Sequence, residues 1–329
     1  MAREGGVLET VRVHLFPLTE MPDERVRIWS AYVVVSTVWG STWLAMKIGL
    51  ETVPPFFAAG LRFLVASAIL YGVIRVRGLK VDFSGDARRV YLTLGVFSFF
   101  IPFALSYWGQ RTIPSGLGSI LFAVYPFSVA LFSRLMLPAE KLDRYKVLGI
   151  LLAFIGLVAI FSGDLTVSDD RALAGMLAVL ASAILAGYSL VVIKKYGQPM
   201  NPFVMNFVGM AIGTVLLLAL ALAAEPVASV AWSWTGACSI LFLALFGSVL
   251  AFVSYYWLLK RMDAVYLSLT SFINPVVAVT LGAAVLGEAL EENVFAGAAL
   301  VMAGILLANG KALEEKYRKR LVPGGLHER

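Results

Sequence analysis

Two cationic side chains lie inside long apolar stretches of the sequence. Lys47 lies near the end of the stretch 28–50, and Arg62 lies within the next stretch, 55–74. A charge at such a position is energetically costly in a membrane and usually serves a function. We expect the two side chains to face each other across a cavity mouth and to attract an anionic group such as a carboxylate, which arginine binds at two points. The alternative for Lys47 is that its ammonium group reaches the membrane surface and binds no ligand.

Aromatic residues accompany these cations. Rings can line a cavity and hold apolar groups, but Trp and Tyr also form belts at membrane interfaces. The pair Tyr107-Trp108 and the run Tyr255 to Trp257 end their stretches, which favours the belt, whereas Trp39 and Tyr188 lie deeper and are predicted to line a cavity. The complete set of predicted substrate-cavity residues is Trp39, Ser41, Trp43, Lys47, Arg62, Tyr107, Ser119, Tyr188, Tyr256 and Asn274.

Two prolines interrupt apolar stretches in the two halves of the chain. Pro126 and Pro275 each remove a backbone donor and free a carbonyl one turn earlier. Such carbonyls are tolerated inside a membrane only where protein or water satisfies them. We therefore predict paired kinks beside the cavity, with possible hinge motion. The alternative is that the kinks fit the shape of the bundle without contacting a ligand.

The elements that must position these residues are transmembrane helices. Of 329 residues, 60% are hydrophobic and 15% are charged, whereas soluble domains carry about 25% charged residues. A bilayer-spanning helix needs about 20 apolar residues. The sequence contains ten suitable runs, at 28–50, 55–74, 90–109, 115–137, 146–162, 172–193, 202–224, 234–258, 265–286 and 293–309. The fold class is predicted to be all-α.

The basic residues predict how these helices are oriented. With the N-terminus inside, all but four of the 27 lysines and arginines fall in inside segments; Arg111 and Arg171 lie outside, and Lys47 and Arg62 lie within helices. Cytoplasmic loops hold such an excess. We expect a multi-pass protein of the inner (plasma) membrane with cytoplasmic tails at 1–27 and 311–329. This membrane topology accounts for the positions of the basic residues, so no nucleic-acid partner is expected.

The sequence also repeats weakly. Tyr107-Trp108 aligns with Tyr256-Trp257, Pro126 with Pro275, Ser119 with Ser268, and Lys47 with Lys194. The two predicted repeats span 28–162 and 172–310, and each holds five helices. An odd number of helices turns the second repeat upside down relative to the first. Inverted repeats are typical of alternating-access transporters, which bind substrate between the halves.

These motifs resemble a known family. Trp39-Gly40-Ser41-Thr42-Trp43, the segment Pro54-Pro55-Phe56-Phe57 before Leu61-Arg62-Phe63, Asn274-Pro275 and Leu286-Gly287-Glu288 are similar to the EamA-type family, the ten-helix branch of the drug/metabolite transporter superfamily. The resemblance covers residues 28 to about 310. It implies transport of amino acids, metabolites or drugs through a central cavity.

The function expected from these observations is secondary transport of a small organic metabolite, an amino acid or similar solute, in the direction of efflux. All 21 acidic residues fall outside the predicted helices, which favours facilitated or exchange transport over a carboxylate proton relay. The alternatives are an integral-membrane enzyme and a non-transporting receptor or scaffold. With its only histidines, His14 and His327, in the tails, the chain offers no metal or triad constellation. No cofactor and no metal are expected. The expected partners are substrate and membrane lipid, and a homodimer is left open.

Overall fold

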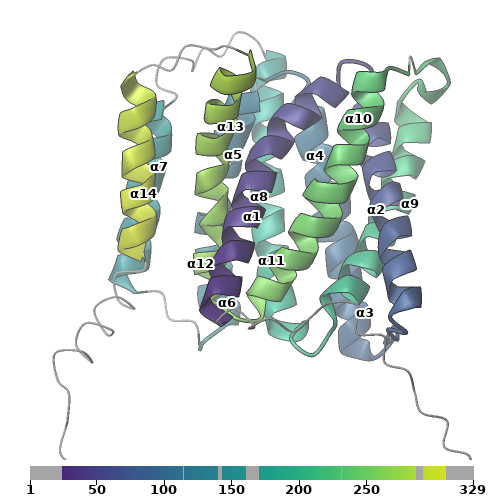
Figure 1. Cartoon of the computed structure of the whole chain (residues 1–329), viewed down its shortest axis with the longest axis horizontal. Coiled ribbons are helices and arrows are strands. Elements are labelled where there is room, and N and C mark those ends of the chain that lie inside the picture. Colours follow the sequence, from purple (N-terminus) through teal and green to yellow (C-terminus); the bar gives the residue numbers. More distant parts are fainter. Residues whose placement is uncertain are drawn as a thin grey trace, which may run out of the picture.

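The computed structural model of the chain describes residues 24–113, 115–139, 143–160, 170–230, 232–286 and 292–308. Most of the two predicted tails and the residues Gly287 and Glu288 lie outside this part of the chain. Within it, every regular element is a helix, as the composition predicts. The helices stand side by side in one bundle (Figure 1).

The elements of the first half are α1 (Glu24–Gly49), α2 (Pro55–Val76), α3 (Gly85–Leu92), η1 (Thr93–Phe100), α4 (Ile101–Gly109), α5 (Ser115–Phe122), α6 (Tyr125–Met136) and α7 (Arg144–Ile160). Those of the second half are α8 (Asp170–Tyr196), α9 (Pro202–Ala224), η2 (Val227–Ser229), α10 (Trp234–Phe242), η3 (Leu243–Leu250), α11 (Ala251–Leu259), α12 (Ala264–Ser268), α13 (Thr270–Leu286) and α14 (Glu292–Ala308). The elements α3, η1 and α4 form one continuous rod, and so do α10, η3 and α11.

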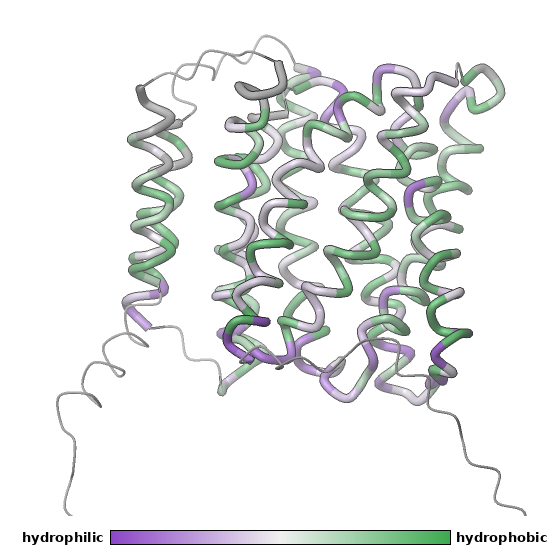
Figure 2. Tube along the Cα trace, viewed as in Figure 1, coloured by the Kyte–Doolittle hydropathy of each residue, from purple (hydrophilic) through white to green (hydrophobic). Residues whose placement is uncertain are grey.

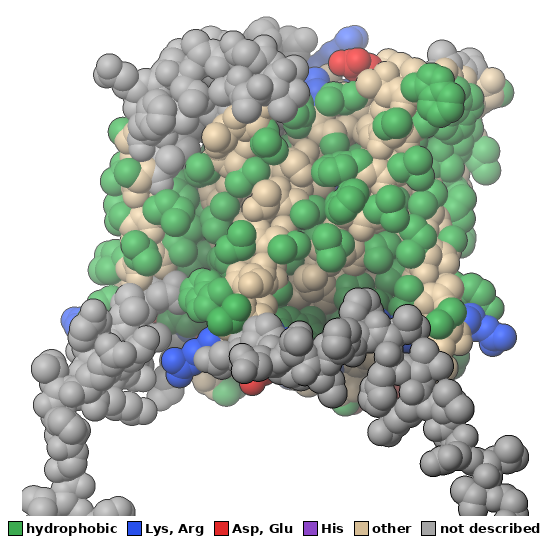
Figure 3. All heavy atoms as spheres, viewed as in Figure 1, with side chains coloured by type: hydrophobic (Ala, Val, Ile, Leu, Met, Phe, Trp, Pro, Cys, Tyr) green, Lys and Arg blue, Asp and Glu red, His purple; other side chains and the backbone are tan. Residues whose placement is uncertain are grey.

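The outer surface is apolar in its middle band. Among the described residues, six helices are long and apolar enough to cross a membrane, and shorter apolar helices accompany them. The hydrophilic positions gather toward the two ends of the bundle (Figure 2). On the face shown in Figure 3, hydrophobic side chains cover the middle, and Lys and Arg lie at the edges. The chain is therefore a polytopic membrane protein, while the count of ten spans stays a prediction.

The two halves pack on each other in a reciprocal way. Helix α1 packs on α11 and α13 of the second half, and α8 packs on the corresponding α4 and α6 of the first. Likewise α2 contacts η3, and α9 contacts η1. Both η1 and η3 are π-helical, so each half has a wide helical turn at the same place. Wide turns of this kind are rare and occur frequently at functional sites.

Helices α7 and α14 pair with each other at one side of the bundle (Figure 1). Their contact is made by glycines: a Cβ atom added at Gly149 would lie 2.5 Å from the Gly304 carbonyl oxygen, and one at Gly156 would lie 2.6 Å from that of Gly297. Only residues without a side chain allow backbones to approach so closely. The four glycines thus allow the backbones of these two helices to pack in close contact.

Candidate functional site

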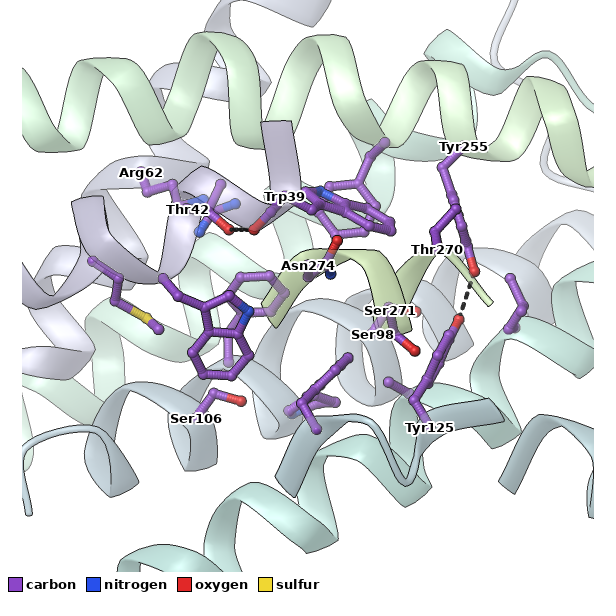
Figure 4. A pocket seen from close by; sticks show the side chains of 18 of the residues that line it. Trp39, Thr42, Arg62, Ser98, Ser106, Tyr125, Tyr255, Thr270, Ser271 and Asn274 are labelled. Atoms are coloured by element: carbon purple, nitrogen blue, oxygen red, sulfur yellow. Dashed lines mark hydrogen bonds between the residues drawn. The ribbon is translucent and has the colours of Figure 1, made fainter. Parts of the chain in front are cut away.

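A cavity of about 120 Å³ lies between the middle turns of the helices (Figure 4). Its wall comes from α1, α2, η1, α4, α5 and α6 of the first half and from α8, α11 and α13 of the second. The polar and charged lining residues are Thr42, Arg62, Ser98, Ser106, Tyr125, Tyr255, Tyr256, Thr270, Ser271 and Asn274. The rest of the described lining is apolar or aromatic, notably Trp39, Trp43, Phe103, Phe122 and Phe252.

Arg62 is held rigidly in the wall. Its side chain is only 3% exposed. Nε donates to Ser248 Oγ at 2.8 Å, and Nη1 lies 3.4 Å from the Tyr107 hydroxyl. The guanidinium carbon lies 4.9 Å from the centre of the Phe103 ring, a cation–π distance. Within the described residues, no carboxylate pairs with this cation. The cavity therefore presents a fixed positive charge.

The π-helical turn η3 orients two of the lining residues. The indole Nε1 of Trp39 donates to the Gly247 carbonyl oxygen at 3.2 Å, and Arg62 binds the neighbouring Ser248. Ser248 Oγ in turn donates to the Leu243 carbonyl oxygen at 3.0 Å. A π-helical turn displaces backbone carbonyls from the regular α-helical pattern. Here it brings one carbonyl and one hydroxyl toward the first half.

Hydroxyl groups and an amide form the opposite wall. The Tyr125 and Tyr255 hydroxyls lie 2.9 Å apart and link α6 to α11 (Figure 4). Tyr255 also packs on Trp39, with 4.6 Å between ring centres. With its amide nitrogen toward the Ser36 and Thr270 carbonyl oxygens, at 3.2 and 3.0 Å, Asn274 fixes α13 to α1. The Tyr125–Tyr255, Trp39–Tyr255 and Ser36–Asn274 contacts join one half of the chain to the other.

Lys47 does not face Arg62 across a cavity mouth. Its ammonium group donates to the carbonyl oxygens of Gln110 and Ile113, at 3.2 and 3.4 Å, at the end of α4. Lys194, its counterpart in the repeat, donates to the Leu259 and Met262 carbonyl oxygens, at 2.6 and 2.8 Å, at the end of α11. A cation near a helix C-terminus satisfies carbonyls that lack partners within the helix. The two lysines thus act as equivalent helix clamps, and Lys47 is not among the described lining residues.

Four other predicted residues lie outside the lining. Ser41 Oγ donates to the Val38 carbonyl oxygen of its own helix at 2.7 Å. Tyr107 is 1% exposed and stands behind Arg62, and Ser119 is buried away from the cavity. Tyr188 packs its edge against Phe97 and Phe132. Among the predicted cavity residues, Trp39, Trp43, Arg62, Tyr256 and Asn274 are the ones that do line it.

The two prolines occupy different settings. Pro126 lies in the first turn of α6, just after the break that separates α5 from α6. Pro275 lies inside α13, next to the lining residue Asn274. Both stay candidates for the predicted kinks and hinges.

The interface-belt interpretation is wrong for three tyrosines. Tyr107, Tyr255 and Tyr256 are 1–3% exposed, whereas Trp108 is 37% exposed. The tyrosines end apolar stretches in the sequence, but the helices around them cover their rings. Tyr125, Ser106 and Tyr255 are lining residues that the prediction missed. The repeat could have found Tyr125, since the offset that pairs Pro126 with Pro275 also pairs Tyr125 with the predicted cavity residue Asn274.

A helical bundle with an apolar outer surface and a central, largely apolar cavity that carries a few polar groups is the arrangement of a multi-pass membrane transporter. The chain belongs to the EamA-like transporter family, which matches residues 27–162 and again residues 173–310. The double match agrees with the repeat in the sequence.

Named relatives cover nearly the whole chain. The chain is 28% identical over 282 residues to the transporter YoaV of Bacillus subtilis (strain 168), which covers 86% of this chain and 96% of the relative. It is 28% identical over 291 residues to the inner membrane transporter YedA of Escherichia coli (strain K12), covering 87% and 92%. A protein crystal structure with 20% identity and a TM-score of 0.75 covers 88% of this chain and 98% of its own, and so has the same fold.

Proposed function

We propose that this protein is a secondary transporter that moves a small organic solute through the central cavity by alternating access. In this proposal the chain has ten transmembrane spans, arranged as two inverted five-helix repeats in the inner membrane, with both termini in the cytoplasm. The observation that carries the proposal is the cavity itself, whose wall is shared between the two halves. A solute bound there touches both repeats, so movement of one repeat against the other changes the side from which it is accessible.

Contacts at both ends of the bundle support this mechanism. At the end predicted to be cytoplasmic, Lys146 pairs with Asp263 at 2.7 Å and Arg261 pairs with Glu24 at 3.4 Å. Each pair joins a residue of the first half to one of the second.

The opposite end also carries contacts that join the two halves, and there they are hydrogen bonds. Ser239 donates to the Ala45 carbonyl oxygen at 2.5 Å, and the Thr52 and Ser233 hydroxyls lie 3.1 Å apart. Glu225, at the end of α9, accepts the Phe56 and Phe57 amide protons at 2.8 and 2.9 Å. Alternating access requires that some contacts at one end open while those at the other hold.

The test of function is solute flux into liposomes that contain the purified protein. Counterflow of a broad panel of labelled solutes, with and without a pH gradient, would establish transport and its coupling. Saturable flux of any one class supports the proposal. Absence of flux for every solute, from protein that is folded and oriented in the vesicles, would overturn it.

Topology is tested separately. The chain has one cysteine, Cys238, so a Cys238→Ser background accepts single cysteines at Arg88 and Glu51, which lie at opposite ends in the proposed topology. Labelling of the two from opposite sides of the membrane is expected. Labelling of both from one side would contradict the proposed passage of α2 across the membrane.

A further inference from the structure

We propose, building on the transport function above, that the substrate is an organic monocarboxylate with an apolar or aromatic body. Its carboxylate binds the outer edge of the Arg62 guanidinium group, and its body lies among the rings of the cavity. The proposal replaces the amino acid expected from the sequence with an anion that lacks an ammonium group.

The first step is the charge of the wall. Among the described residues that line the cavity, Arg62 is the one that carries a charge, and none is Asp or Glu. A fixed cation in a low-dielectric cavity attracts an anion and repels a second cation. A monoanion would neutralise the site, whereas a zwitterion would bring an ammonium group that meets hydroxyls, an amide and aromatic rings but no carboxylate among the described lining residues.

The second step is the donor geometry of Arg62. Ser248 engages Nε and Tyr107 lies at the far limit of bonding to Nη1. The second proton of Nη1 and both protons of Nη2 have no acceptor among the described residues. This edge carries the parallel N–H pair that binds a carboxylate in two-point geometry. Since Ser248 and the Phe103 ring already fix the guanidinium plane, little orientational freedom is lost on binding.

Gly247 keeps the Nη2 atom accessible. A Cβ atom added at Gly247 would lie 2.9 Å from Nη2 and 2.8 Å from the Thr42 side chain. A glycine at this position therefore avoids a side chain that would press against Nη2, while its carbonyl oxygen anchors Trp39.

The third step is the body of the substrate. The aromatic lining residues form two groups, one with Trp39, Phe252 and Phe103 and the other with Trp43 and Phe122. Ring centres of Trp39 and Phe252 are 5.0 Å apart, and those of Trp43 and Phe122 are 5.8 Å apart. Such walls suit a flat, apolar group.

The negative charge of the proposed substrate also favours one direction of transport. The loaded carrier is neutral at the site and the empty carrier keeps the Arg62 charge. An inside-negative membrane potential drives a net negative charge outward. Export of a monoanion is therefore favoured by the potential without a proton relay.

A charge series with one ring system tests the proposal. The ligands are 3-phenylpropanoate (anion), L-phenylalanine (zwitterion), 3-phenylpropanamide (neutral) and 2-phenylethylamine (cation), and binding is measured by quenching of tryptophan fluorescence in the purified protein. We expect the anion to bind about ten- to a hundredfold more tightly than the amide, and the cation to bind most weakly. Equal affinity for anion and amide, or tighter binding of the zwitterion, would overturn the proposal.

Variants locate the effect at Arg62. Arg62→Gln should remove the preference for the anion and leave binding of the amide nearly unchanged, and Arg62→Lys should restore part of the preference. Arg88→Gln, which removes an exposed arginine on α3, is the matched control and should behave as the parent. If Arg62→Gln fails to fold, Gly247→Ala is the second variant, and it should weaken binding of the anion more than that of the amide. An unchanged anion preference in a folded variant of either kind would refute the assignment.

Flux separates this proposal from the function on which it rests. In liposomes with an imposed potassium diffusion potential, flux of 3-phenylpropanoate should reverse direction when the potential is reversed. Saturable flux of a cationic or neutral class alone would refute the monocarboxylate and leave the transporter standing. Absence of all flux would refute the transporter.

Discussion

The ion pair between Lys146 and Asp263 offers a direct test of how the end of the bundle that we propose to be cytoplasmic opens. It links α7 of the first half to the start of α12 in the second, with 2.7 Å between Nζ and Oδ2. The Lys146 side chain is 5% exposed and that of Asp263 18% exposed, so solvent screens the pair weakly. The Lys146 ammonium also lies 4.7 Å from the centre of the Tyr266 ring. We predict that Lys146→Met raises the population of the state that is open to the cytoplasm.

The magnitude follows from the kind of contact. A hydrogen bond to a charged group contributes about 1.5–3 kcal/mol, and in an alternating-access carrier this contact exists only while the cytoplasmic end is closed. Its loss should shift the equilibrium toward the open state by about ten- to a hundredfold. Asp263→Asn should act similarly, because Oδ2 loses its charge while Oδ1 can still accept the Val265 amide proton, a bond of 2.9 Å that caps α12.

The assay measures how fast a membrane-impermeant maleimide reaches the cavity. In a Cys238→Ser background, Ser271→Cys places a thiol in the cavity wall, and inside-out vesicles expose the cytoplasmic face. Lys146→Met should accelerate labelling. The control is Asp86→Asn, since Arg89 and Asp86 form a longer pair of 3.8 Å whose side chains are 55% and 70% exposed, and such pairs contribute about 0–1 kcal/mol.

Two results would refute this reasoning. One is an unchanged labelling rate in Lys146→Met, which would mean that the pair does not hold the closed state. The other is strict additivity of Lys146→Met and Asp263→Asn in the double variant, since two residues that act through one bond must show coupling.

Three further predictions concern the packing of the helices, and each is tested by thermal unfolding in detergent. Lys47→Met and Lys194→Met should lower Tm to a similar extent, because each removes two bonds to helix-end carbonyls; a large difference between them would contradict their equivalence. Gly149→Val should lower Tm strongly by separating α7 from α14, whereas Gly72→Val, with open space around its position, should not; equal effects would refute the close backbone contact. Glu225→Gln should cost about 1 kcal/mol by removing a charge from the start of α2, and an unchanged Tm would show that the bonds can form equally well with an amide.

The fold could be predicted because its signals are local. An apolar stretch, a run of basic residues and a proline each report on the few residues around them, and together they predict helices and their order. The repeat added the pairing of equivalent positions, which the family matches in both halves. Helix α1 is a partial exception, since its Ser, Thr and Trp residues make it less apolar than the six clear candidates.

The site was only partly predictable because burial is a property of the whole bundle. Lys47 and Arg62 have the same sequence signature, a cation in an apolar stretch. Their contacts differ because α4 ends beside Lys47 and offers carbonyl oxygens. Arg62 instead binds Ser248, which is 186 residues away in the sequence. A contact of that range leaves no local pattern. The same holds for Tyr107, whose ring is covered by helices distant in sequence.

Equivalent positions of the two halves differ where the halves pack on each other, so the buried Arg62 charge occurs in only one of the two equivalent contacts. Under the offset that pairs Lys47 with Lys194, the counterpart of Arg62 is Gly209. Under the offset that pairs Tyr107 with Tyr256, the counterpart of Ser248 is Phe99. Where α2 meets η3, a guanidinium group binds a hydroxyl at 2.8 Å; where α9 meets η1, a Cβ atom added at Gly209 would lie 3.0 Å from the Phe99 ring.

The contact between α2 and η3 and the contact between α9 and η1 are therefore equivalent in the repeat, but the first is polar and the second is apolar. The matched features, such as the lysine clamps and the π-helical turns, maintain two similar halves, which the proposed alternating-access mechanism requires. The unmatched features differentiate the two contacts: Arg62, where α2 meets η3, lines the cavity, whereas Phe99, where α9 meets η1, is fully buried and is not among the described lining residues. A symmetric pair of arginines would bind a dianion and repel itself when empty, whereas a single arginine suits a solute with one anionic end.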